Sequence, residues 1–264
     1  MQPFDLCRVG TVLAVSLVLC ASAQAVLQDE LEVFDDHSLT PAGSPGLAIH
    51  MNATPLGRIH PNFANEIVSH HGLRTMFELS HGIRQDFELG IHIPTAFDEQ
   101  GRFYTPGIRP RARWIPVRSI DGEGWFLGSN FEISFIDPRF EESRRRFELR
   151  PILGYRAREW VFALNPGWTW PLTNATGSRR PLFALDWKYL RSVSDQVRLG
   201  LESYGNRGPA NSFLPYDQQN RAVFAVAEFV AGDWRWNIGV GHGLTAASDS
   251  WTIKAVLELP LEKW

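Results

Sequence analysis

The chain has 264 residues and a formal charge of −3, and 44 % of its residues are hydrophobic. Its 22 Gly and 17 Pro are too many for a helical bundle and too few for a disordered chain. The near-neutral charge, without a basic tail, argues against nucleic acid as a partner.

The N-terminus has the pattern of a secretory signal peptide. An apolar run at residues 9–20 follows Arg8 and precedes the small-residue sequence Ala23-Gln24-Ala25, which is typical of a cleavage site. We therefore expect residues 1–25 to be removed when the protein is exported.

Both cysteines of the chain, Cys7 and Cys20, lie inside this predicted signal peptide. A lipoprotein cysteine at Cys20 is the alternative, but Leu19 precedes it, where such a site needs a small residue. The mature chain is thus predicted to have neither a disulfide nor thiol chemistry.

Residues 26–42 form an acidic N-terminal segment, which we expect to be mobile. Residues 43–264 show no helical period of useful length. Instead, apolar and polar residues alternate with period two, as in half-buried strands, between clusters of Gly, Pro, Asp and Ser. Twelve such runs are predicted as strands: 45–53, 72–80, 86–95, 107–117, 124–136, 145–156, 159–170, 181–190, 196–205, 221–230, 234–242 and 250–261.

The alternation separates charged from aromatic side chains. In the run 107–117, three arginines share one face, whereas Ala112 and Trp114 share the other. Over all the runs, nine of the ten Trp fall on the apolar face, many near run ends. A soluble barrel or sandwich, the alternative fold, would have to bury them all. A transmembrane barrel turns its apolar face to lipid, with aromatic girdles at both interfaces and a polar lumen.

The connections between the runs give an independent indication. After the first run, long and short gaps alternate, as in outer-membrane barrels, which have short periplasmic turns and longer external loops. The sequence therefore predicts an all-β fold, an antiparallel transmembrane β-barrel of about 12 strands in the cell outer membrane. The short gaps are 81–85, 118–123, 157–158, 191–195 and 231–233, and the long ones are 54–71, 96–106, 137–144, 171–180, 206–220 and 243–249.

Three stretches of sequence resemble a known family. Residues 78–90 read ELSHGIRQDFELG, residues 200–205 read GLESYG, and residues 237–249 read NIGVGHGLTAASD. Together they resemble the exported family labelled MetA-pathway of phenol degradation. The resemblance covers most of residues 43–261 and rests on motifs of barrel turns. It implies an outer-membrane, transporter-like barrel that takes up small hydrophobic or aromatic compounds.

The lumen-facing positions of the predicted strands are rich in charge, with eleven basic residues against seven carboxylates. This excess of four predicts an electropositive channel that concentrates anionic solutes such as aromatic carboxylates, which arginine binds through its planar fork. The alternative is an Arg–Glu network that fills the lumen and holds it rigid. The predicted substrate-binding residues are Arg109, Arg111, Arg113, Glu132, Arg146, Glu148 and Arg150.

Other chemistry has weaker support in the sequence. His50, His92 and His242 are expected on lumen faces, but their spacing fits no metal-binding motif, so neither a metal nor a cofactor is predicted. An outer-membrane, lipid-modifying enzyme would need a Ser–His pair, for which His242 with Ser248 or Ser250 are candidates. A G-x-S-x-G motif is absent, and we expect no enzymatic activity.

The predicted function is therefore a channel or transporter for small organic solutes, aromatic or anionic ones among them. Two alternatives stay open: a structural barrel with a plugged lumen that transports nothing, and the lipid-modifying enzyme. The expected partners are outer-membrane lipid and a small-molecule solute.

Overall fold

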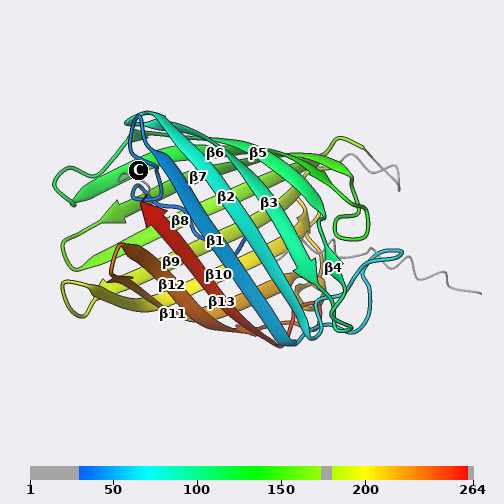
Figure 1. The fold of residues 1–264 in the computed structure, drawn as a ribbon. Coiled ribbons are helices and arrows are strands. Elements are labelled where there is room, and N and C mark those ends of the chain that lie inside the picture. The colour runs from blue at the N-terminus through cyan, green and yellow to red at the C-terminus, as the bar shows by residue number, and fades with distance from the viewer. Residues whose placement is uncertain (1–29, 174–179, 261–264) are drawn as a thin grey trace, which may run out of the picture.

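The structure, a computed structural model, describes residues 30–173 and 180–260. These residues form a closed antiparallel barrel of twelve long strands, with a two-residue strand, β4, beside β3 (Figure 1). Among the described residues, no helix is long and apolar enough to cross a membrane. The elements are β1 (Pro45–Leu56), β2 (Gly72–Arg84), β3 (Phe87–Phe97), β4 (Phe103–Tyr104), β5 (Gly107–Val117), β6 (Gly124–Ile136), β7 (Arg145–Arg156), β8 (Trp160–Pro171), β9 (Leu182–Ser192), β10 (Val197–Pro209), the 3₁₀ turn η1 (Tyr216–Gln218), β11 (Asn220–Ala231), β12 (Trp234–Gly243) and β13 (Trp251–Pro260).

The predicted fold class is confirmed, and so are the twelve strands. The predicted runs 107–117, 124–136 and 145–156 have the same bounds as β5, β6 and β7, and the others differ by at most four residues at an end. The short strand β4 was not predicted, because it lies inside the expected connection 96–106.

The barrel closes by pairing its first and last strands. β1 pairs with β13 in an antiparallel register that runs from Gly46↔Pro260 to Ala53↔Ile253, and β2 pairs with both β1 and β3. Both the start of β1 and the end of β13 therefore lie at one end of the barrel, on the left in Figure 1. The short connections, such as the one between β11 and β12, lie at this end, which we call the short-turn end. The opposite end, with the longer connections, is the long-loop end.

Side chains alternate between the lumen and the outer face as predicted. On β5, Arg109, Arg111 and Arg113 are at most 4 % exposed, whereas Ile108 and Trp114 on the other face are 42 % and 43 % exposed. Because the side-chain period of a strand is two, a slip by one residue would turn three arginines toward lipid. The register of β5 is thus strongly fixed.

Aromatic side chains on the outer face gather at the strand ends. At the short-turn end, neighbouring rings of Trp125, Tyr155, Trp160 and Tyr189 form a continuous row across β6 to β9, with centroids 5.2–6.3 Å apart. At the long-loop end, the rings of Phe147 and Trp170 stack on each other, and those of Trp168 and Phe183 are also in contact. Two girdles at opposite ends of an apolar belt are the pattern of a membrane-spanning barrel.

The N-terminal segment corrects one of our expectations. Residues 30–40 are not a mobile tail: they enter the lumen, and Leu31, Val33, Phe34 and Asp36 are all at most 5 % exposed. We call residues 30–40 the plug. The predicted signal peptide, residues 1–25, lies outside the described residues.

Candidate functional site

The plug is held in the lumen first by contacts of its backbone. The side chain of Asn165 on β8 accepts a hydrogen bond from the amide of Phe34 (2.7 Å) and donates one to its carbonyl (3.1 Å). The ammonium of Lys254 on β13 donates to the carbonyl of Leu31 (2.9 Å). These bonds satisfy plug groups that would otherwise be buried without partners.

Apolar contacts add to this hold. Leu31, Val33 and Phe34 join one buried cluster with apolar residues of the lumen wall, among them Ile152 and Phe224. The ring of Phe34 also lies beneath two guanidiniums, with the Cζ atom of Arg113 4.0 Å and that of Arg150 5.2 Å from its centroid. Such cation–π contacts are strongest where water is excluded.

Two plug carboxylates bind basic residues near the short-turn end. Asp35 contacts Lys188 on β9 (3.1 Å) and Arg156 on β7 (2.9 Å). Asp36 accepts two hydrogen bonds from the same arginine, at 3.0 and 2.8 Å from Nε and Nη2, and a third from the hydroxyl of Ser119. Both bonds from Arg156 end on the same oxygen, Oδ1 of Asp36, and such charge-assisted hydrogen bonds are stronger than those between neutral groups.

Deeper in the lumen, all seven predicted binding residues face inward, and six of them are buried. Arg111 is hydrogen-bonded to Glu78 and, at 2.8 Å, to Glu88, instead of to Glu132 on the next strand. Arg113 donates to the carbonyl of Ser38 in the plug. The residues predicted to line a constriction are thus brought together, but they bind one another and the plug. Their role in binding a solute stays a prediction.

Arg109 and Arg146 share a partner that the sequence did not reveal. Glu141 lies in the connection between β6 and β7, yet it is 3 % exposed and contacts Arg109 at 3.2 Å and Arg146 at 3.4 Å. On β7, Arg150 pairs with Glu148 at 2.8 Å. The length of the gap 137–144 predicts an external loop, and no pattern in it shows that one carboxylate turns inward.

The charges of the plug complement those of the wall. The wall positions identified from the sequence have an excess of four basic residues, and the plug contributes four carboxylates: Glu30, Glu32, Asp35 and Asp36. The sequence therefore contained a signal for the plug, because the charge of the acidic segment is opposite in sign to the excess charge predicted for the lumen.

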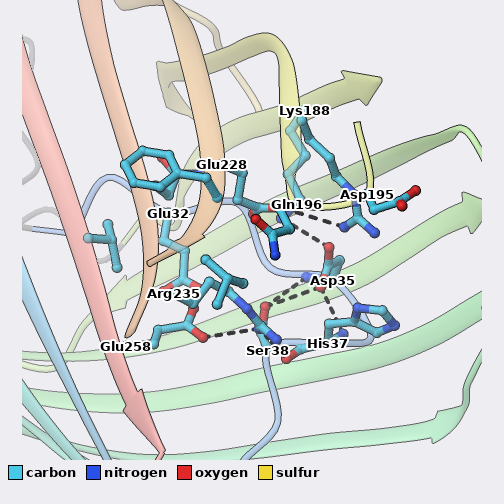
Figure 2. Close-up of a pocket in the computed structure, with 15 residues that line it drawn as sticks. Glu32, Asp35, His37, Ser38, Lys188, Asp195, Gln196, Glu228, Arg235 and Glu258 are labelled. Carbon is cyan, nitrogen blue, oxygen red and sulfur yellow. Dashed lines mark hydrogen bonds and ion pairs between the residues drawn. The ribbon is translucent and has the colours of Figure 1, made fainter. Parts of the chain in front are cut away.

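Cavities remain around the plug. A cavity of about 190 Å³ lies near the short-turn end, where Asp35 and His37 of the plug face Lys188 and Arg235 of the wall (Figure 2). Another of about 350 Å³ lies beside β1 and β2, and one of about 80 Å³ lies on the long-loop side of Leu31. The plug thus stands between the cavities at the two ends of the lumen.

The position of His242 corrects a second expectation. It faces outward, not into the lumen: its side chain is exposed, and its ring lies 4.8 Å from that of Trp251. The reason is parity, because Arg235 and Asn237 face inward and an even-numbered residue of β12 must face outward. Its Nδ1 atom lies 2.8 Å from the backbone carbonyl of Ser250, while the Ser248 hydroxyl bonds to the backbone of Arg221. Neither serine hydroxyl is in a catalytic pair with it.

Comparison with solved structures gives the same fold. The chain is similar to a KdgM porin (TM-score 0.52, 10 % identity, covering 82 % of this chain and 99 % of that one). It is also similar to a NanC porin (TM-score 0.53, 9 % identity, covering 82 % and 98 %) and to a KdgM porin in complex with disordered oligogalacturonate (TM-score 0.50, 10 % identity, covering 82 % and 99 %). No family profile and no curated protein sequence matches the chain.

These likenesses show a fold of the outer-membrane barrel type. Together with the apolar belt and the aromatic girdles of the outer face, the fold places the protein in the outer membrane. The resemblance to the family labelled MetA-pathway of phenol degradation stays a prediction.

Proposed function

We propose that this protein is an outer-membrane channel for small organic solutes, held shut by its own N-terminal plug. The observation that carries the proposal is the acidic plug inside an arginine-lined lumen. Its partners are then the lipid around the apolar belt and a small-molecule solute inside, and it catalyses no reaction.

Anionic solutes suit this lumen best. With the plug displaced, Arg156 and Lys188 would lose Asp35 and Asp36, and two guanidiniums would lose the ring of Phe34. Groups that now bind carboxylates and an aromatic ring would then be free for a solute that carries both, such as an aromatic carboxylate. The resemblance to a family linked to aromatic compounds supports the same class of solute. The complex of the KdgM porin with oligogalacturonate supports a channel function for this fold.

The connection of the plug to the barrel suits displacement. Between the plug and β1, Gly43 has a φ of +81°, a left-handed conformation that favours glycine, and no atom would lie within 4 Å of an added Cβ. Because the plug is attached only at this end among the described residues, it could leave the lumen without breaking a strand pairing.

A second candidate function is a structural barrel that transports nothing. The density of ion pairs in the lumen favours it, because a fully paired network rigidifies a core. The lipid-modifying enzyme gains no support from the surroundings of His242.

Conductance across a planar bilayer separates the two candidates. We would compare the mature wild-type barrel with Asp35→Asn/Asp36→Asn, which removes two plug charges and keeps the side-chain size, and use Asp195→Asn as a matched control. Asp195 lies between β9 and β10 at the short-turn end, outside the plug. A channel predicts longer openings and an anion-selective current in the double variant, reduced by added benzoate. Folded but silent barrels of both proteins would favour the structural candidate.

A further inference from the structure

Two histidines are fully buried in the lumen, and one of them is held on both sides by carboxylates. The Nε2 atom of His92 on β3 lies 3.2 Å from Glu78 on β2, and its Nδ1 atom lies 3.0 Å from Glu132 on β6. His92 has no exposed surface. An imidazole fixed in this way has one orientation.

The plug brings a further carboxylate to this histidine. Glu30, His92 and Glu132 each offer one ligand atom, and these atoms lie within 4.8 Å of one another. The Oε1 atom of Glu30 is buried and has no hydrogen-bond partner, and the guanidinium of Arg150 is 3.8 Å away from it. A buried carboxylate oxygen without a hydrogen bond is costly unless something else binds it.

The arrangement around His92 is the one that metal-binding histidines have. Such a histidine usually donates its second ring N–H to a carboxylate, which fixes its tautomer and orientation. Glu78 is placed to accept from Nε2, which leaves Nδ1 facing Glu132. A neighbouring triad of Glu32, His50 and Glu78 has similar spacing. There, however, the second ring nitrogen of His50 has no hydrogen-bond partner, so this support is missing.

The local charge also calls for a cation. Ion pairs and close contacts among the described residues link seven carboxylates, five guanidiniums and the two imidazoles into one cluster, so that neutral imidazoles leave two negative charges. One divalent ion or two protons would neutralise them. The carboxylates are Glu30, Glu32, Glu78, Glu88, Glu132, Glu141 and Glu148, and the guanidiniums belong to Arg109, Arg111, Arg113, Arg146 and Arg150.

We propose that Glu30, His92 and Glu132 bind a divalent transition-metal ion, with Glu78 as the positioning residue for His92. One imidazole nitrogen and two carboxylate oxygens are a donor set that suits Zn²⁺ and leaves a coordination position open. Because Glu30 belongs to the plug while the other two ligands belong to the wall, the ion ties the plug to the barrel.

Zinc binding to the folded, detergent-solubilised full-length mature barrel tests this site without reference to conductance. Isothermal titration with ZnCl₂ should give one ion per wild-type chain, and MgCl₂ should give none. Glu30→Gln and His92→Gln should each weaken binding at least about tenfold, and Glu78→Gln by about 10- to 100-fold. Glu228→Gln makes the same substitution at a carboxylate that pairs with Arg198 outside this cluster; it is the matched control and should bind Zn²⁺ as the wild-type chain does.

The absence of zinc binding in the wild-type barrel would overturn the proposal. Unchanged affinity in Glu30→Gln, or a loss in Glu228→Gln as large as in Glu30→Gln, would overturn it as well. Because Glu30 lies outside the strands, its variant keeps the test valid even if His92→Gln fails to fold.

A consequence for gating rests on the proposed function. If the ion ties the plug to the wall, Zn²⁺ should reduce the current through the wild-type channel but not through Glu30→Gln. Zinc binding without any current in either protein would contradict the channel and leave the metal site standing.

Discussion

At the scale of single residues, Phe34 joins the two kinds of contact that hold the plug. It is fully buried, belongs to the apolar cluster, and lies beneath the guanidiniums of Arg113 and Arg150. The residue before it, Val33, is apolar too, whereas the two residues that follow, Asp35 and Asp36, are acidic. The plug thus combines apolar anchoring and ion pairing within four residues.

Phe34→Ala should release the plug. Truncating a buried phenylalanine typically costs about 3–5 kcal/mol, and here that loss falls on the plugged state and not on the strand pairing. We expect a plug that is cleaved faster by an added protease while the barrel stays folded. Phe103→Ala, an exposed phenylalanine of β4, is the control, and equal cleavage in both variants would contradict the anchoring role.

The ion pairs of Arg111 stabilise the barrel wall and not the plug, because both of its partners lie on strands. Its guanidinium is buried between Glu78 and Glu88. Arg111→Gln would therefore leave Glu78 without a guanidinium partner and Glu88 with only that of Arg113, at 3.6 Å. Breaking a buried pair in this way costs about 3–5 kcal/mol. Denaturant unfolding in detergent should show this loss.

A partly exposed ion pair near the short-turn end provides the control for the stability loss of Arg111→Gln. Arg198 contacts Glu228 at 3.5 Å, and its side chain is 34 % exposed, so Arg198→Gln should cost at most about 1 kcal/mol. Equal losses for Arg111→Gln and Arg198→Gln would contradict the account of the buried network.

At the scale of the elements, the outer face of each strand is specified by the lipid around it. Phe131 lies near the middle of β6, opposite Ala112 of β5 and Leu149 of β7. Phe131→Arg should destabilise the barrel by about 2–4 kcal/mol in lipid vesicles, because arginine is costly at the bilayer midplane. Phe135→Arg, near the long-loop end of the same strand, should cost about 0–1 kcal/mol. Unfolding in vesicles measures both, and the absence of a depth dependence would contradict the transmembrane orientation.

The strands could be predicted from the sequence because their signal is local. Alternation over about ten residues fixes both the strand and its two faces, and alternating gap lengths fix which connections share an end. The error for His242 came from assigning one residue to the wrong parity in a run that was otherwise correct. The two-residue strand β4 is too short to show any period.

The plug and the histidine site could not be predicted in the same way, because their signals are not local. Leu31, Val33 and Phe34 are too few to show a period, and the acidic residues around them look like a solvated tail. Glu30, His92 and Glu132 are brought together by the plug and by two strands that are not neighbours in the barrel. Their spacing in sequence therefore fits no motif.

At the scale of the whole molecule, the charge of the plug is opposite in sign to that of the predicted lumen wall. A lumen with an excess of basic residues would attract anions, and the acidic plug offsets that excess and stands between the cavities at the two ends. The central claim is that the plug closes a channel that the barrel would otherwise provide.

The most direct test is to lock the plug in place and then release it within the same molecule. The side chains of Asp36 and Ser119 are hydrogen-bonded to each other, and the only natural cysteines are Cys7 and Cys20 in the predicted signal peptide. The variant Asp36→Cys/Ser119→Cys would therefore form a single disulfide between the plug and the wall. We would measure its conductance in a planar bilayer before and after adding a reductant. The account predicts a closed barrel when the disulfide is formed and an anion-selective current once it is reduced; the same current in both states would contradict it.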